Sequence, residues 1–214
     1  MGHGTALDNS PRSRITGLTA SDLAATALFA FEGAVIASGA RLDLFGVLVV
    51  ACVSALGGGT ARDLLIGDVP TASVRDVRYV VVSTIGGLLA FGAYRAVVHN
   101  EWELLVVLDA AGLALFAVVG AMKAFDRHLP VLSAALVGTV TAVGGGMMRD
   151  LLIGRVPVVL REDVYATAAL AGSLIVAVGL SRGHDRTRVA IAGGLACFIL
   201  RILAHHFGWN LPTA

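Results

Sequence analysis

One fourteen-residue segment of the chain occurs twice. It reads GGGTARDLLIGDVP from Gly57 and GGGMMRDLLIGRVP from Gly144, so eleven of its fourteen positions are identical at an offset of 87 residues. Identity at this level does not arise by chance in 214 residues, and an internal repeat constrains the fold more than any local pattern. We therefore expect two similarly folded units, with the functional site where they meet.

Composition decides the broad class of the protein. Hydrophobic residues make up 57% of the sequence and charged residues 14%, which is too apolar for a water-soluble domain and indicates an integral membrane protein. The net charge is +1 without a basic run, which excludes nucleic-acid binding. Cys52 and Cys197 lie in apolar runs at no metal-ligand spacing. With no Ser/His/Asp set, catalytic carboxylate pair or Walker loop, the sequence predicts no enzyme and no cofactor.

Seven apolar stretches are each long enough to cross the roughly 30 Å of hydrocarbon in a bilayer, which takes about 20 helical residues. They are continuously apolar, whereas the strands of a membrane β-barrel alternate, so the predicted fold class is an all-α integral membrane protein. A polar N-terminal tail, residues 1–21, precedes them. The seven predicted transmembrane helices are 22–40, 43–66, 77–98, 103–124, 131–153, 163–181 and 188–207.

The offset of 87 residues extends beyond the repeated segment, since it also relates Asp22 to Asp109. The first three helices (22–98) match the next three (103–181), and the last helix (188–207) stands outside the repeat. Because each unit crosses the membrane an odd number of times, the second is inverted relative to the first, a plan that many transporters share. The whole chain then forms a single membrane domain. An excess of Lys and Arg in the links on the side of the N-terminus favours a cytoplasmic N-terminus.

Three adjacent glycines in each copy are unusual in a membrane helix, because each costs about 1 kcal/mol of helix propensity relative to alanine. Glycines either let helices pack closely or break a helix so that its carbonyls face a cavity and replace the water shell of a cation. Small residues that serve packing are usually four apart, so adjacent triplets favour a break, and we predict kinks in the second and fifth helices. Ser54 and Thr141, about one helical turn before the triplets, could add hydroxyl ligands. The predicted ion pathway comprises Gly57, Gly58, Gly59, Ser54, Gly144, Gly145, Gly146 and Thr141.

Several charged residues lie within or at the ends of the predicted helices. Adjacent side chains on a helix point about 100° apart, so we expect Arg62 to pair with a residue other than Asp63. Two interpretations of these charges are open: they gate or brace a pore, or they anchor the protein at the membrane surface, with arginines and Lys123 snorkelling. Glu32 lies mid-helix and is a functional candidate by position, although protonation or a hydrogen bond to a neighbouring backbone would also explain it. The predicted gating or structural charges are Arg62, Asp63, Arg149, Asp150, Glu32 and Lys123.

The doubled motif GGG-x-x-RD-LLIG-x-VP, with the segment from Asp109 to Gly120 before its second copy, resembles a bacterial membrane family known by its glycine transporter domain. That family is similar to the trimeric intracellular cation (TRIC) channels. The resemblance covers about residues 20–207. It implies a protomer of seven helices assembled as a homotrimer, with a pore for monovalent cations, chiefly potassium, in each protomer and kinks at the glycine triplets.

These features predict a homotrimeric potassium channel of a prokaryotic inner or plasma membrane, with its pore along the second and fifth helices. The expected permeant ion is K+, with Na+ as a second candidate, bound transiently at the glycine triplets and at no other metal site. Membrane lipids and other copies of the chain are the expected partners. The alternative is a secondary transporter of glycine or a similar zwitterion, in which a half-helix N-terminus binds the carboxylate and Glu32 or Asp63 pairs with the ammonium.

Overall fold

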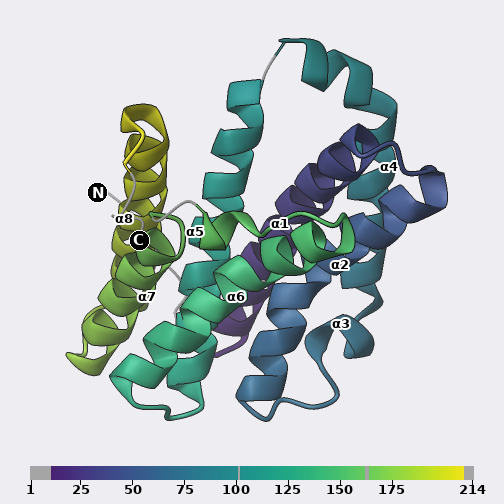
Figure 1. Cartoon of the computed structure of the whole chain (residues 1–214). Helices are drawn as coiled ribbons and strands as arrows, with labels where there is room; N and C mark the ends of the chain where they lie inside the picture. Colours follow the sequence, from purple (N-terminus) through teal and green to yellow (C-terminus); the bar gives the residue numbers. More distant parts are fainter. Residues whose placement is uncertain (1–10, 101, 162–163, 210–214) are drawn as a thin grey trace, which may run out of the picture.

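The computed structural model describes residues 11–100, 102–161 and 164–209, and Figure 1 shows them as a bundle of helices. Among these residues the regular structure is helical throughout, in agreement with the predicted all-α class. The elements in chain order are α1 (Pro11–Gly39), α2 (Leu44–Leu65), α3 (Ala72–Arg75), α4 (Val77–Asn100), α5 (Trp102–Asp126), α6 (Val131–Leu152), the 3-10 turn η1 (Val158–Leu160), α7 (Ala166–Ser181) and α8 (Arg186–Phe207).

Each of the seven predicted ranges falls on an observed helix, but only six of the seven predicted crossings are confirmed among the described residues. Six helices in the described part of the chain are long and apolar enough to cross a membrane. The predicted span 163–181 corresponds to α7, which has 16 residues and is shorter than the usual crossing. The first helix begins at Pro11, so the predicted tail extends too far; residues 1–10 lie outside the described residues.

The two copies of the repeated segment end their helices in the same way. Gly67 and Gly154 follow α2 and α6 with positive φ angles of 69° and 71°. This left-handed conformation suits glycine and stops a helix. The amide of Asp68 then donates to the carbonyl of Asp63 at 2.7 Å, and Arg155 donates to Asp150 at 2.9 Å. The LLIG part of each motif is therefore a helix stop.

Many large apolar side chains face outward, while small and polar side chains make up much of the interior. α2 packs against α6 and α1, while α5 packs against α6, α7 and α8. Exposed residues such as Leu89, Leu132 and Leu195 form an apolar exterior, whereas the core contains many alanines together with buried charges. At the centre the rings of Phe29 and Phe116 stack with centroids 5.3 Å apart. This inside-out polarity suits a protein surrounded by lipid.

The links between helices define two ends of the bundle. We call the first end the one that carries the links α2–α4, α5–α6 and α7–α8, which gather at the lower edge of Figure 1. The second end carries the links α1–α2 and α6–α7. α2 runs towards the first end and α6 towards the second, so the two copies of the repeated segment deliver their Arg-Asp pairs to opposite ends.

Candidate functional site

The glycine triplets lie where α2 and α6 cross. A Cβ atom at Gly58 would lie 2.1 Å from the carbonyl oxygen of Thr141, and one at Gly145 would lie 2.0 Å from that of Ser54. These four residues are related pairwise by the offset of 87, so the two helices make the same contact in both directions. No larger residue fits at either glycine, because the obstructing atoms are backbone.

The helices continue through both triplets, and the predicted break is wrong. α2 is helical from Leu44 to Leu65 and α6 from Val131 to Leu152, which leaves the predicted kinks unconfirmed. Close packing, the other interpretation, is what the structure has. The argument from spacing failed because successive glycines serve different neighbours: a Cβ at Gly57 would meet Met148 of α6, whereas one at Gly59 would lie 3.5 Å from the guanidinium of Arg62 on its own helix.

Ser54 and Thr141, the predicted hydroxyl ligands, are fully buried beside this crossing. Thr141 donates to the carbonyl of Val137 at 2.6 Å, and Ser54 Oγ has no hydrogen-bond partner among the described residues. Glycines on the neighbouring helices make room for both: Gly33 of α1 lies against Ser54, and Gly120 of α5 against Thr141. The four positions again form two pairs at the offset of 87.

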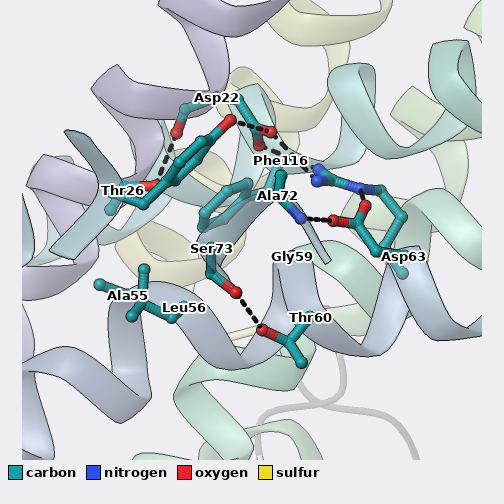
Figure 2. Close-up of a pocket in the computed structure, with 12 residues that line it drawn as sticks. Asp22, Thr26, Ala55, Leu56, Gly59, Thr60, Asp63, Ala72, Ser73 and Phe116 are labelled. Atoms are coloured by element: carbon teal, nitrogen blue, oxygen red, sulfur yellow. Dashed lines mark hydrogen bonds and ion pairs between the residues drawn. The ribbon is translucent and has the colours of Figure 1, made fainter. Parts of the chain in front are cut away.

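A first charge cluster lies at the first end, and its members come from α1, α2, α4 and α5: Asp22, Arg62, Asp63, Tyr79 and Lys123. Arg62 donates through both terminal nitrogens to the two oxygens of Asp22, at 2.9 and 3.1 Å. Tyr79 and Lys123 donate to the same carboxylate at 2.9 and 2.8 Å. Figure 2 shows Asp22 and Asp63 on either side of one guanidinium group, which belongs to Arg62, with Ala72 beside Asp63.

Arg62 does pair with a residue other than Asp63, namely Asp22, but the expectation that it does not pair with Asp63 is wrong. Arg62 Nε does pair with Asp63, at 2.9 Å, because the guanidinium folds back across Gly59 and presents Nε to the adjacent carboxylate. Arg149 pairs with Asp150 at the same distance. Neither arginine is a surface anchor, since Arg62 is 1% exposed and Arg149 3% exposed. Lys123 is also turned inward to an ion pair, with 21% of its side chain exposed.

The aspartate of each motif also holds the chain that follows its helix. Asp63 accepts a hydrogen bond from the amide of Ala72 at 2.8 Å, and Asp150 accepts one from the amide of Val158 at 2.9 Å. Each aspartate therefore uses one oxygen for its neighbouring arginine and the other for the backbone of the next element. This double use explains why Arg and Asp occur together in both copies.

A second charge cluster lies at the second end, with members from α1, α5, α6 and α8 and the residue before α7: Glu32, Asp109, Arg149, Asp150, Tyr165 and Arg201. Arg149 pairs with Glu32, which is buried. Tyr165 donates to Asp109 at 2.8 Å. Arg201 Nε lies 3.5 Å from the other oxygen of Asp109, and its guanidinium lies over the ring of Tyr165 at 4.7 Å from the centroid.

Each charge cluster lines a cavity, and the two cavities differ in size. The cavity at the first cluster is about 10 Å³ and is lined by Asp22, Arg62, Asp63 and Phe116, among others. The cavity at the second cluster is about 160 Å³. Within the described residues no group of three His, Cys, Asp or Glu side chains is arranged to hold a metal ion.

The structure brings together five residues that the sequence analysis did not assign to a site: Asp22, Asp109, Tyr79, Tyr165 and Arg201. Asp22 and Asp109 were visible as two acidic residues in apolar helices at equivalent repeat positions. Arg201 was visible as a lone charge in the last apolar stretch, where a charged residue is a functional candidate by default. The tyrosines lie at an offset of 86, one residue away from the repeat, and gave no comparable signal.

Comparison with known proteins supports the repeat and the membrane assignment. A family model described as Glycine transporter matches the chain twice, over residues 19–95 and 106–181, with starts 87 residues apart. The UPF0126 membrane protein SCO4104 of Streptomyces coelicolor is 45% identical over 196 residues, which cover 91% of this chain and 89% of that protein. The UPF0126 inner membrane protein YadS of Escherichia coli K12 is 36% identical over 193 residues, covering 90% and 93%.

Solved structures of cation channels share this fold. One, described in terms of conductance through TRIC cation channels, has a TM-score of 0.84 at 35% identity and covers 92% of this chain and 96% of its own. The TRIC trimeric intracellular cation channel orthologue from Rhodobacter sphaeroides has a TM-score of 0.83 at 33% identity, with 91% and 100% covered. The similarity therefore extends over nine-tenths of this chain.

Proposed function

Because the chain belongs to the glycine transporter family and has the fold of TRIC cation channels, we propose that it is a passive channel for K+, with Na+ as a second permeant ion. It is a multi-pass protein of the bacterial cell membrane, like its inner membrane relative. The path for ions follows α2 and α6 within each protomer. The two repeat units are inverted relative to each other, so that each end of the path is built from the same motif.

The observation that carries this proposal is the reciprocal crossing of α2 and α6 between two buried charge clusters. The glycine triplets bring the two backbones into contact, which closes the path at its centre. Separating the two helices by a small distance would open a passage lined by the hydroxyls of Ser54 and Thr141 and by the carbonyl oxygens of the same two residues, which face the opposite glycines. Such oxygens replace the water shell of a monovalent cation.

The two motif arginines restrict the ends of this path. A guanidinium in a cation path raises the barrier to passage, and Arg62 and Arg149 are each held by two acidic partners. Opening therefore includes a change in these ion pairs. Three protomers assemble around a common axis, as the trimeric description of the Rhodobacter channel suggests for this fold, and membrane lipids surround the trimer.

The direct test is recording from the purified protein in a planar bilayer with asymmetric KCl. A reversal potential close to that of potassium is expected. A reversal near the chloride potential, or currents no different from those of a protein-free bilayer, would contradict the proposal. Arg62→Gln and Arg149→Gln should each alter open probability or conductance while light scattering still detects trimers.

A secondary transporter of glycine or another small zwitterion is the second candidate function. The description of the family as a glycine transporter favours it, and the second charge cluster offers a carboxylate, Glu32, that could bind an ammonium group. Uptake of labelled glycine into proteoliposomes separates the two candidates. Saturable glycine accumulation that depends on a proton or sodium gradient would show that the protein is a carrier and not a channel.

A further inference from the structure

The two charge clusters differ at two equivalent positions. Lys123, which neutralises Asp22 in the first cluster, corresponds at the offset of 87 to Ile36, which lines the second cavity. Glu32, which joins the second cluster, corresponds to the buried Val119. Relative to the first cluster, the second has lost a cation and gained a carboxylate.

Arg201 of α8 replaces the lost cation, but no described side chain of the second cluster balances the added carboxylate of Glu32. In the first cluster, Arg62 and Lys123 balance the carboxylates of Asp22 and Asp63. Among the described residues of the second cluster, two cationic side chains face three carboxylates: Arg149 and Arg201 against Glu32, Asp109 and Asp150. The second cluster thus holds one carboxylate in excess within the membrane-spanning region, where an uncompensated charge is costly.

The excess can be traced to one atom of Glu32. Its Oε1 accepts a hydrogen bond from Arg149, while its Oε2 is buried and has no hydrogen-bond partner among the described residues. By contrast, Asp109 receives Tyr165 on one oxygen and faces Arg201 with the other, and both oxygens of Asp150 accept hydrogen bonds. Glu32 is therefore the carboxylate of this cluster with an unused oxygen.

The cavity of about 160 Å³ connects this carboxylate to the second end. Its polar lining comes from α1, α5, α6 and α8 and comprises Glu32, Asp109, Arg149, Arg201 and His205, the last of which is exposed. The guanidinium groups of Arg149 and Arg201 line this cavity and would repel a metal cation inside it. A proton avoids that repulsion because it sits on the oxygen itself and turns Oε2 from an unpaired acceptor into a hydroxyl donor.

We propose that Glu32 is a proton-binding site that is reached through the cavity at the second end and controls the net charge at that mouth of the path. The proton comes from water and binds to Oε2, which neutralises the excess carboxylate. When the proton leaves, the cluster is negative and attracts permeant cations to the mouth. Given the proposed channel function, acidification at the second end lowers the single-channel cation current, and acidification at the first end does not.

Single-channel recording with pH varied on each side separately tests the effect on current. Wild-type protein should lose current on acidification of one side only, and Glu32→Gln should lose this pH dependence. Ile36→Lys, which restores the cation present in the first cluster, should also abolish it. His205→Gln is the matched control, because it removes another titratable group at the mouth and leaves Glu32 in place. An unchanged response in Glu32→Gln, or a response lost only in His205→Gln, would overturn the proposal.

Infrared difference spectroscopy during a pH titration tests proton binding without any current. Of the carboxylic-acid C=O bands that appear on acidification of the wild type, one should be missing in Glu32→Gln. If currents are absent and this band is present, the channel proposal fails and the proton site stands. If the band is absent and the current instead saturates with K+ in a way that Glu32→Gln removes, the site binds the metal cation and the proton proposal is wrong.

Discussion

The two ends of the bundle start from the same motif and reach different electrostatic solutions. At the first end every charge comes from the repeat helices, and Asp22 accepts hydrogen bonds from three side chains, those of Arg62, Tyr79 and Lys123. At the second end Arg149 forms its ion pair with Glu32. Asp109, the equivalent of Asp22, instead accepts a hydrogen bond from Tyr165 and pairs with Arg201 of α8. A repeated motif therefore preserves the arginine–aspartate scaffold, while single substitutions around it set the charge of each end.

The centre of the molecule does not share this asymmetry. Gly58 and Gly145 face the carbonyls of Thr141 and Ser54 at nearly the same distance, and Phe29 stacks on its own equivalent, Phe116. Backbone packing at a crossing leaves no room for side chains to diverge, whereas a charge cluster can be rebalanced by any nearby helix. The contrast between a symmetric centre and unequal ends leads to three predictions.

The largest effect is expected from removing a charge at the first end. Asp22→Asn leaves Arg62 and Lys123 opposite one carboxylate, and breaking a buried ion pair in this way costs about 3–5 kcal/mol. Asp109→Asn removes a carboxylate from the cluster that has one in excess, so we expect a loss of only about 1 kcal/mol from weaker hydrogen bonding. Thermal unfolding of both variants in one detergent measures the difference.

Asp126→Asn is the control for these two variants. Its carboxylate pairs with Arg186 at 2.7 Å but is 42% exposed, and an exposed pair contributes about 0–1 kcal/mol. Equal losses for Asp22→Asn and Asp109→Asn would show that the charge balance of the two ends does not determine their stability.

A smaller and equal effect is expected at the two sides of the crossing. Gly58→Ala and Gly145→Ala each push a methyl group into a backbone carbonyl, and overpacking of this kind costs about 1–3 kcal/mol. Gly92→Ala on α4 has no atom within 4 Å of the added carbon and should cause no loss, with a gain of up to about 1 kcal/mol from helix propensity. Unfolding midpoints of the three variants check this, and a clear difference between the two crossing variants would refute the symmetric centre.

The smallest effect concerns the link after α2, where the motif copies differ: Asp68 in the first copy is Arg155 in the second. Asp68 bridges Arg75 and Arg127 at 2.9 and 2.8 Å. Partial burial opposes ionisation, but the hydrogen bonds and charges of Arg75 and Arg127 outweigh it and hold the pKa of Asp68 below its ordinary value of 3.8. Because the folded-state pKa is the lower one, this bridge stabilises the fold above that ordinary value and stops doing so as the pH falls through the folded-state pKa.

Asp68→Asn should therefore lower stability at neutral pH by about 0.2–1 kcal/mol per exposed pair and change it little in acid. The measurement is the difference in unfolding midpoint between variant and wild type at both pH values. Arg155→Asn is the matched change in the second copy, and a similar pH-dependent loss there would remove the contrast between the two links.

Apolar length and the doubled motif were enough to locate the helices, and for α2 and α6 their boundaries as well. The predicted spans 43–66 and 131–153 differ from α2 and α6 by at most one residue at each end, because Gly67 and Gly154 mark where helical φ angles stop. The pairing within Arg62-Asp63 was not predictable from the angle between adjacent side chains. A long guanidinium can fold back where a glycine leaves space, and that space is defined by a residue three positions earlier.

The sequence by itself determined that this chain is a membrane bundle with a duplicated unit, since apolar length and an 87-residue identity are properties of the chain alone. Only the tertiary structure decided what the glycine triplets do, because a glycine permits a break or a close contact equally well until the neighbouring helix is placed. It also decided which acid each arginine binds. Buried charges pair with whatever opposite charge packing brings within reach, and at the second end that includes Arg201 from α8, a helix with no counterpart in the repeat against which its role could have been compared.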